Sequence, residues 1–427
     1  MGTGPVRVGV LGCGNVGAAL VTLVDRQATA IEARTGLRLE VTRVAVRNLA
    51  KDRPVSLPPG CLTHDAAAVV TDPEVDVVVE VIGGIEPART LVLEALKAGK
   101  PVVTANKELL ANVGADLFAA AEAARVDLLF EAAVAGAIPL IRPLRESLAG
   151  ERIRRVMGIV NGTTNYILTR MSEDGVDYAE ALAEAQGLGY AERDPTADVE
   201  GFDAGAKAAI LATIAFGVSV VAGDVYHEGI SSITTTDISF ARRLGYAIKL
   251  LAIADAGDDG RIAVRVHPAM VPLGHPLAAV RDSFNAVFIE GDAVGELMLY
   301  GRGAGGMPTA SAVLGDLIDA AGNVRKGTHA SIGLLPRATV RPIDEVVSEY
   351  YLNLEVLDRP GVLHAVSGAF AAHDISIRSM EQEGLGDEAR LIFITHEAPE
   401  SAVSATLRDL RELEVVDRIA SLLRVVG

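Results

Sequence analysis

Three glycines with a fixed spacing follow the first apolar run of the chain. The segment VGVLGCGNVGAAL places Gly12, Gly14 and Gly17 as G-x-G-x-x-G between an expected strand and an expected helix. Bare backbone amides and a helix N-terminus can hold a pyrophosphate at such a turn. A glycine-rich turn without a ligand is the alternative, but the position at the start of a βαβ unit favours dinucleotide binding. The expected nucleotide site also includes Asn15, Val16 and Ile82.

The choice of nucleotide should depend on the end of the second expected strand, near Val46. An NAD-specific enzyme usually has a carboxylate there, which accepts hydrogen bonds from the ribose 2′-hydroxyl. This chain has Arg47, whose guanidinium suits a 2′-phosphate, with Lys51 and Arg53 close by in the sequence. The alternative is that Arg47 is a solvated loop residue. The sequence therefore predicts a preference for NADP, with NAD possible.

Two lysines could take part in proton transfer. Lys107 lies in PVVTANKELL, between a strand and a helix, where ligands of open α/β sheets gather. Lys207 follows Asp203 by one helical turn and shares a helix face with Ile210 and Ile214, so its ammonium should be partly buried. A lysine in such a place shifts its pKa readily, which suits proton transfer. The alternatives are a solvated loop lysine and an exposed Asp-Lys pair.

The elements that must position these residues alternate along the N-terminal part of the chain. Strands are expected at 6–11, 39–46, 75–82, 101–105 and 127–132, with helices from 16, at 90–98 and at 108–124. This alternation is typical of a doubly wound parallel sheet. We therefore expect an α/β fold that opens with a Rossmann-type dinucleotide-binding domain.

The pattern changes at residue 136. Strands at 152–160, 262–266 and 284–291 and a helix at 203–216 predict an α+β domain for catalysis and dimerisation. A glycine cluster at 301–309 leads into a helix at 310–320 that we expect to pack beside the first domain. The expected domains are 1–135 with 303–322 returning, 136–302, a linker at 323–346, and 347–427.

The C-terminal unit reads as strand, helix, two strands, helix and strand, at 350–357, 362–373, 375–383, 389–396, 401–413 and 415–426. This is a ferredoxin-like βαββαβ order. Its turn LDRPGVL places Asp358, Arg359 and Gly361 where amides at a helix N-terminus can receive the carboxylate of a free amino acid. The alternative is a unit that only assembles subunits.

Composition limits the possible partners and compartments. The 427 residues are 50% hydrophobic, enough for two or three domains, and carry a net charge of -17. That charge disfavours binding to nucleic acid or to an anionic membrane.

Two cysteines make no disulfide framework, and the first residues do not resemble a signal peptide, so we expect a cytoplasmic protein. The longest uncharged stretch, 208–223, is too short to span a membrane, and the eight histidines show no zinc spacing.

Four segments resemble homoserine dehydrogenases: GIVNGTTNYIL at 158–168, VTANKELLA at 103–111, GLGYAERDPTADVEGFDAGAK at 187–207 and YGRGAGGMPTASAVLGD at 300–316. The last quarter, which opens with LEVLDRPGVL, resembles an ACT domain, a small regulatory module that binds amino acids. With no aspartate kinase segment before Met1, the resemblance is to the monofunctional form. One departure from the family's glycine fingerprint is Cys13, at a position that contributes backbone more than side chain.

The resemblance implies NAD(P)H-dependent interconversion of aspartate semialdehyde and homoserine. It implies that Lys207 transfers the proton with help from Asp203, that Lys107 is a second active-site lysine, and that Glu192 and Asp203 bind the substrate. Gly189 and Gly305 should lie near the cofactor. A monovalent cation, Na⁺ or K⁺, is implied in EAAVAGAIP at Glu131, Val134, Gly136 and Ile138, mostly through backbone carbonyls.

The resemblance also implies a homodimer or homotetramer, because ACT domains usually pair sheet edges across subunits. The effector would then lie at an interface that includes Ile375 and Ser376, with threonine as the expected inhibitor. Two other functions are alternatives for such a chain. Another amino-acid dehydrogenase should lack the NGTTNY and GAGGMPT segments, and a non-catalytic amino-acid sensor should have lost Lys207 or the glycine loop. The chain keeps all four features.

Overall fold

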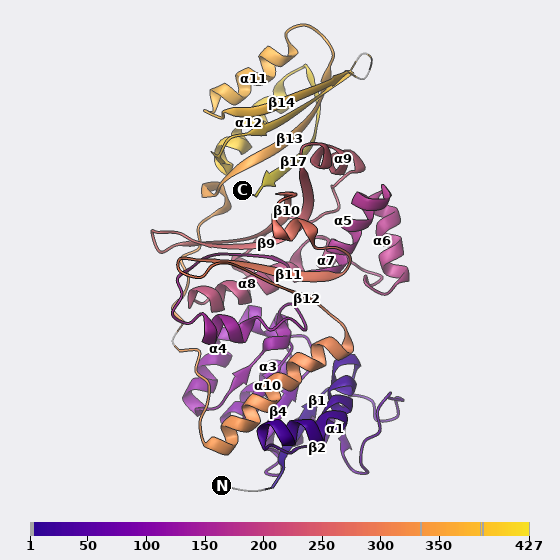
Figure 1. Ribbon diagram of the computed structural model, residues 1–427, viewed down its shortest axis with the longest axis vertical. Coiled ribbons are helices and arrows are strands. Elements are labelled where there is room, and N and C mark those ends of the chain that lie inside the picture. The colour runs from indigo at the N-terminus through magenta and orange to yellow at the C-terminus, as the bar shows by residue number, and fades with distance from the viewer. Residues whose placement is uncertain (1–3, 334, 385, 387, 427) are drawn as a thin grey trace. The chain divides into compact units, whose positions relative to one another are not determined.

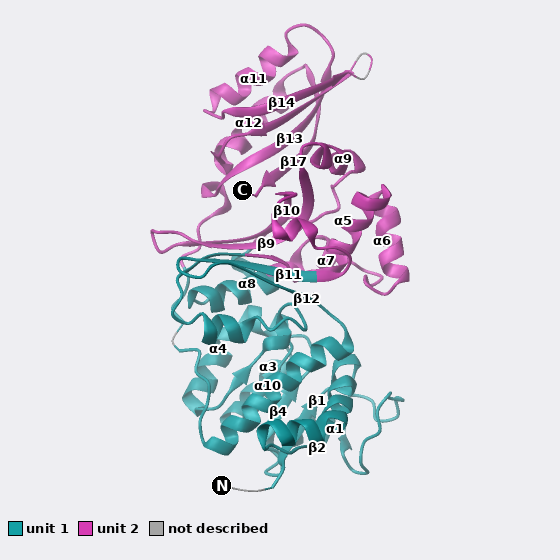
Figure 2. Ribbon diagram, viewed as in Figure 1, with its two compact units in different colours: residues 1–156, 206–225, 285–338 teal, residues 157–205, 226–284, 339–427 magenta. Residues whose placement is uncertain are grey.

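The computed structural model describes residues 4–333, 335–384, 386 and 388–426 (Figure 1). The chain forms two compact units (Figure 2). Unit 1 comprises residues 1–156, 206–225 and 285–338, and unit 2 comprises residues 157–205, 226–284 and 339–427. Three elements span a boundary between the units: β7 (Ile153–Ile159), α8 (Phe202–Phe216) and β11 (Phe284–Gly291). No helix in the described ranges is long and apolar enough to cross a membrane.

Unit 1 is built around a six-stranded parallel sheet in the order β3-β2-β1-β4-β5-β6. Its central strands are valine-rich and buried on both faces, as parallel strands between helical layers must be. The elements are β1 (Val6–Leu11), α1 (Asn15–Thr35), β2 (Leu39–Ala45), β3 (Leu62–Thr63), α2 (Ala66–Thr71), β4 (Val77–Glu80), α3 (Ala88–Lys97), β5 (Val102–Thr104), α4 (Lys107–Ala124) and β6 (Leu128–Leu129). The predicted Rossmann-type fold is confirmed.

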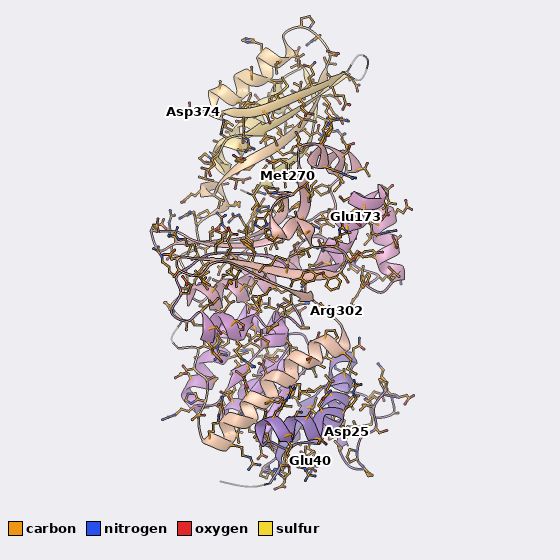
Figure 3. All side chains as sticks on the ribbon, in the orientation of Figure 1. Asp25, Glu40, Glu173, Met270, Arg302 and Asp374 are labelled. Atoms are coloured by element: carbon orange, nitrogen blue, oxygen red, sulfur yellow. The ribbon has the colours of Figure 1, made fainter. Side chains whose placement is uncertain are left out.

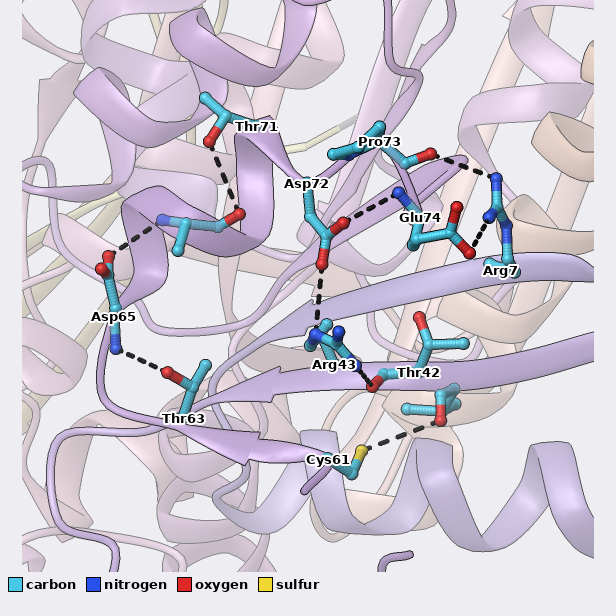
Figure 4. Close-up of polar contacts among 12 residues, drawn as sticks. Arg7, Thr42, Arg43, Cys61, Thr63, Asp65, Thr71, Asp72, Pro73 and Glu74 are labelled. Atoms are coloured by element: carbon cyan, nitrogen blue, oxygen red, sulfur yellow. Dashed lines mark hydrogen bonds and ion pairs between the residues drawn. The ribbon is translucent and has the colours of Figure 1, made fainter. Parts of the chain in front are cut away.

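The short helix α2 and strand β3 were not predicted, because neither is long enough to show a periodic pattern. Polar contacts hold this segment in place (Figure 4). The Asp65 carboxylate accepts a hydrogen bond from the first turn of α2. Asp72 then pairs with Arg43 of β2 at 3.1 Å. Side chains rather than local propensity therefore fix the connection between β2 and β4.

The end of the sheet differs from the prediction. The strand expected at 127–132 is only β6, and a 3-10 turn at Glu131–Ala133 follows it. The chain turns there because the Glu131 carboxylate accepts hydrogen bonds from the amides of Ile141 and Arg142, at 2.7 and 2.9 Å. A π-helical turn at Pro143–Ser147 comes next, and β12 (Gly295–Arg302) follows β11 later in the unit.

The helix α10 (Gly306–Lys326) belongs to the core of unit 1 although it is distant in sequence. Its Val313 and Leu317 are in the same hydrophobic cluster as Val8 of β1 and Leu20 of α1. The helix extends beyond the expected 310–320 at both ends. It stops at Gly327, which takes the left-handed conformation that favours glycine.

Unit 2 contains a run of strands in the order β9-β10-β17-β13-β15-β14. Its elements are α5 (Gly162–Asp174), α6 (Tyr178–Gly187), α7 (Thr196–Val199), β8 (Tyr226–His227), α9 (Thr235–Arg243), β9 (Tyr246–Ala256), β10 (Ile262–Pro272), β13 (Val347–Leu357), α11 (Val362–Ala372), β14 (Ile377–Gly384), β15 (Glu388–Thr395), β16 (Ala398–Pro399), α12 (Glu400–Glu412) and β17 (Val416–Val425).

The C-terminal part of unit 2 has the predicted ferredoxin-like order. Strands β17, β13, β15 and β14 are antiparallel neighbours, and α11 and α12 contribute Val366 and Leu407 to a core with Tyr350 and Phe393. Strand β17 also pairs with β10 in parallel, where Met270, labelled in Figure 3, lies opposite Val425. Backbone pairing therefore joins the C-terminal strands to the middle of the chain.

Candidate active site

The glycine fingerprint forms a tight turn between β1 and α1. A Cβ atom on Gly17 would lie 2.1 Å from the carbonyl oxygen of Gly12, so only glycine fits there. Nothing lies within 4 Å of the Cβ position of Gly14, which precedes α1 without a capping side chain. The first amides of α1 therefore have no side-chain cap, as pyrophosphate binding at a helix N-terminus requires.

Other residues predicted at the nucleotide site lie beside this turn. The Ile82 side chain follows β4 and approaches Gly12, with its Cγ2 atom 3.0 Å from the Cβ position. Gly305 precedes α10 with a φ of 119°, and the Cβ position of its neighbour Gly306 is 3.1 Å from the carbonyl oxygen of Asn15. The structure thus brings the two glycine-rich turns of the sequence together within unit 1.

Arg47 lies just past β2 and is exposed, as is Lys51. Arg53 is engaged differently, because its guanidinium donates hydrogen bonds to the carbonyl oxygens of Asn48 and Lys51. Arg53 therefore supports the backbone of this loop, and Arg47 presents its side chain at the surface.

The carboxyl ends of β4 and β5 are joined by buried polar side chains that the sequence analysis missed. The Thr104 hydroxyl donates to the Glu80 carboxylate at 2.6 Å, and both residues have no solvent exposure. Asn106 caps α4 by accepting a hydrogen bond from the amide of Leu109 at 3.0 Å, and its own amide donates to the carbonyl of Gly84 at 2.7 Å. Lys107 is the first residue of α4 and is half-buried. Its backbone is therefore fixed on both sides.

In unit 2, one asparagine contacts two acidic residues of the predicted substrate segment. The Asn161 amide donates to Asp198 at 2.6 Å and to Asp203 at 2.9 Å. Asp203 is buried near the start of α8. Lys207 follows one turn later, half-buried, in the part of the helix that belongs to unit 1. The structure agrees with the expected partial burial of Lys207.

Two further predicted residues lie in the loop between α6 and α7. Glu192 is exposed, and its carbonyl oxygen accepts a hydrogen bond from Gln186 at 3.0 Å. Gly189 takes a φ of 77° just past α6. The motif that includes Asp198 was recognised in the sequence, but the contact between Asp198 and Asn161 was not predicted.

The segment predicted to hold a monovalent cation is buried in unit 1. Val134 and Ile138 are almost fully covered, and Ala135 and Gly136 both have a φ of 56°. Two consecutive left-handed residues turn successive carbonyl groups sharply, which is unusual for alanine. In the described part of the chain, no group of three or more His, Cys, Asp or Glu side chains could hold a metal ion.

A buried acidic pair lies beside this segment. The Glu131 amide donates to Asp316 of α10 at 2.7 Å, and Arg142 donates to the same carboxylate at 3.0 Å. Burial raises the pKa of Asp316 from 3.8 to about 7, against the opposing effect of Arg142. The Glu131 carboxylate accepts hydrogen bonds from backbone amides on its other side.

The turn predicted to receive an effector precedes α11. Gly361 takes a left-handed φ of 94° and precedes the helix without a capping side chain, while Asp358 and Arg359 are exposed. Ile375 is buried, and the Ser376 carbonyl accepts a hydrogen bond from His396 at 2.8 Å. The described side chains leave the first amides of α11 without a side-chain cap.

Family models match most of the chain. The model described as homoserine dehydrogenase matches residues 139–318, and its NAD-binding domain matches residues 12–131. A model of the ACT domain matches residues 350–415. The homoserine dehydrogenases of Mycobacterium tuberculosis and Corynebacterium glutamicum are each 51% identical to the chain. The match covers 99% of this chain and 98% and 97%, respectively, of those proteins.

The chain belongs to the homoserine dehydrogenase family. It is an NAD(P)-dependent oxidoreductase with a C-terminal ACT domain, as the sequence resemblance implied. The activity interconverts aspartate semialdehyde and homoserine, and the two alternative functions are set aside. The nicotinamide cofactor fits the open glycine turn described above.

Solved structures of homoserine dehydrogenases agree with this assignment. The enzyme from Thiobacillus denitrificans is 43% identical, with a TM-score of 0.94 over 99% of each chain. A hyperthermophilic archaeal homoserine dehydrogenase in complex with NADPH is 28% identical, with a TM-score of 0.62 over 74% of this chain and 98% of that chain.

Proposed function

We propose that Lys207 is the proton-transferring group of this homoserine dehydrogenase, with Asp203 one helical turn before it on α8. The observation that carries the proposal is the position of both residues one turn apart near the start of the same helix, with Asp203 buried and Lys207 half-buried. When bound, the nicotinamide cofactor supplies or accepts the hydride. Lys207 would donate a proton to the alkoxide oxygen during reduction and remove it during oxidation, while Glu192 and Asp203 hold the amino acid.

Replacing Lys207 by alanine tests this role. General acid-base catalysis contributes roughly 10² to 10⁴ in rate, so kcat for homoserine oxidation should fall at least 10²-fold. Lys97→Ala, which removes an exposed lysine from the last turn of α3, is the matched control and should leave kcat unchanged. A folded Lys207→Ala variant with near-normal kcat would contradict the proposal.

For the cofactor, we propose that NADP is preferred over NAD and that Arg47 recognises the 2′-phosphate. Arg47 is exposed at the carboxyl end of β2, where a dinucleotide's ribose is usually recognised. Arg53 stabilises the same loop by donating a hydrogen bond to the carbonyl oxygen of Lys51. Lys107 would lie near the nicotinamide, because it begins α4 at the carboxyl end of the parallel strand β5.

The proposed site also includes a Na⁺ or K⁺ ion held by carbonyl oxygens of Glu131, Val134, Gly136 and Ile138. The paired left-handed residues Ala135 and Gly136 support it, since strain of this kind is usually kept for a function. Bound at this position, the ion would stabilise the loop that follows β6.

Threonine inhibition through the ACT domain is the proposed form of regulation, in a homodimer or homotetramer. The uncapped start of α11 at Gly361 suits an amino-acid carboxylate, with Asp358 and Arg359 beside it and Ile375 and Ser376 at the expected interface. Because β17 pairs with β10, a change in the ACT strands can reach the substrate-binding part of unit 2 directly.

Regulation is best tested by a substitution in the turn. Truncation before the ACT domain would remove β17 from its pairing with β10 and so disturb the rest of unit 2. In the full chain, we expect threonine to inhibit the wild type. Asp358→Ala should weaken inhibition by threonine at least 10-fold. In the absence of threonine, kcat of the variant should be unchanged, because Asp358 is an exposed turn residue. Equal inhibition of both proteins would contradict the assignment of this turn.

The division of the chain into functional domains is proposed as 1–135 with 303–322, 136–302, and 347–427 after a linker at 323–346. The membership of α10 in the core of the first sheet supports the returning segment.

A cytoplasmic location is proposed from the two cysteines, both free thiols, which suit a reducing compartment.

A further inference from the structure

Asn161 joins β7 to α5 and uses every hydrogen-bonding atom of its side chain. Its Oδ1 atom caps α5 by accepting from the backbone amide of Thr164 at 2.9 Å. That bond fixes the orientation of the amide group, because only the oxygen can accept. The nitrogen therefore faces the opposite way, where it donates to Asp198 and to Asp203, at 2.6 and 2.9 Å.

Two of the three side chains that meet here are shielded from water, since Asn161 is 4% exposed and Asp203 is 7% exposed. Asp198 is half-buried. Two carboxylate oxygens within hydrogen-bonding distance of one nitrogen lie close enough to repel each other in this environment. The neutral donor between them offsets that repulsion, and the two bonds fix the rotation of each carboxylate.

We propose that Asn161 is a positioning residue, which holds Asp198 and Asp203 in the orientation that the amino-acid substrate requires. The proposal rests on the substrate-binding role proposed for Asp203. It adds a specific function for the amide nitrogen, which a helix cap alone does not need. Elsewhere in the chain, Asp65, Asp177 and Thr234 cap helices with an oxygen and no amide donor.

Asn161→Asp separates these two functions. The variant keeps the oxygen that caps α5 but replaces the donor with an oxygen that faces two carboxylates. At pH 8, kcat/KM for homoserine should fall about 10- to 100-fold, as expected for the loss of a hydrogen bond to a charged group. The KM for NADP should change less than 2-fold, since the glycine turn that binds the nucleotide lies in unit 1.

The pH dependence identifies the cause of the loss. In Asn161→Asp, the new carboxylate lies beside those of Asp198 and Asp203. Repulsion among the three negative charges raises the pKa of one of them, so the variant should take up a proton as the pH falls. The protonated group can donate as the amide did, and the deficit relative to wild type should shrink at least 5-fold between pH 8 and pH 6. Other charged groups lie near these carboxylates. Lys207 follows Asp203 by one turn of α8, Glu200 ends α7, and the Lys249 ammonium donates to Asn165 of α5.

Each outcome decides the question. Wild-type kcat/KM in Asn161→Asp, or a deficit that stays constant with pH, would overturn the proposal. Asp177→Asn, the same exchange reversed at the exposed cap of α6, is the control and should leave kcat/KM unchanged. If Asn161→Asp does not fold, Asn161→Ser keeps a capping oxygen but cannot reach both carboxylates. A folded serine variant with wild-type kcat/KM would overturn the proposal equally.

Asp203→Asn, measured in parallel, tests the role on which the proposal rests. Full activity in that variant would remove the substrate-binding role of Asp203. In that case, a loss of kcat/KM in Asn161→Asp that shrinks as the pH falls would be assigned to the contact between residue 161 and Asp198.

Discussion

Arg424 of β17 joins the ACT domain to the segment that follows β8 through a buried ion pair. Its guanidinium donates two hydrogen bonds to Glu400 at 2.8 Å and one to Glu228 at 3.0 Å. Tyr350 donates a further hydrogen bond to Glu400 at 2.8 Å. We predict that Arg424→Met destabilises the protein strongly, because it leaves carboxylates without their charged partner.

The burial of the partners sets the magnitude. The Arg424 side chain is 3% exposed and that of Glu400 is 9% exposed, whereas Glu228 is 36% exposed and can reach water. The cost therefore comes mainly from Glu400. Removing one partner of a buried ion pair costs about 3 to 5 kcal/mol, so the free energy of unfolding at pH 7.5 should fall by about that amount.

Arg418 provides a matched control on the same strand. It forms two hydrogen bonds of 2.8 and 3.0 Å with Glu355, but its side chain is 63% exposed. Exposed pairs contribute at most about 1 kcal/mol, so Arg418→Met should have a small effect. Urea denaturation followed by circular dichroism measures both variants.

A second variant tests the reason for the loss. Adding Glu400→Gln to Arg424→Met removes the uncompensated charge and should restore at least half of the lost stability. Equal losses for Arg424→Met and Arg418→Met, or no recovery in the double variant, would refute the reasoning from burial.

The remaining predictions concern cofactor choice and pH. Arg47→Asp should raise the KM for NADPH at least 10-fold more than that for NADH, because a carboxylate repels the 2′-phosphate, and equal losses would mark Arg47 as structural. Asp316 makes stability fall as pH rises: burial raises its pKa to about 7, so the folded protein keeps a proton that the unfolded chain releases near pH 4. The difference in unfolding free energy between wild type and Asp316→Asn should therefore fall by on the order of 3 kcal/mol between pH 4 and pH 7.5. A pH-independent difference would show that Asp316 ionises normally.

Local motifs carried most of what the sequence predicted correctly. The spacing of Gly12, Gly14 and Gly17 and the valine-rich strands around them define the nucleotide-binding sheet over a few consecutive residues. The ferredoxin-like order of the C-terminal unit was predicted for the same reason, since each strand and helix has its own pattern, and the resemblance of LEVLDRPGVL then identified the unit as an ACT domain. Strand β9 was not predicted, because it is buried on both faces over most of its length. Its sequence therefore lacks the alternation of apolar and polar residues that indicates a half-buried strand.

Contacts between distant segments were outside the reach of such patterns. Asn161 and Asp203 are 42 positions apart, and each appeared in the sequence only within its own motif. The segment NGTTNY indicated the family, but nothing in it shows that the first asparagine turns its amide toward the acidic segment. That contact depends on β7 ending beside α7 and α8, which only the fold determines.

Charged residues inside apolar runs gave a signal that could have been used. Lys249 interrupts YAIKLLAIA and Arg424 interrupts SLLRVV, and a lone charge in a buried strand must find polar partners. Lys249 lies against Asn165 at 3.2 Å, and burial lowers its pKa to about 8. Arg424 instead meets carboxylates, which keep it charged. The sequence marks both positions as polar sites within a core, but the partners come from segments 84 and 196 positions away. The pairing of β10 with β17 is what brings Arg424 to Glu228. A charge in an apolar strand thereby becomes a link between the ACT domain and the segment that follows β8.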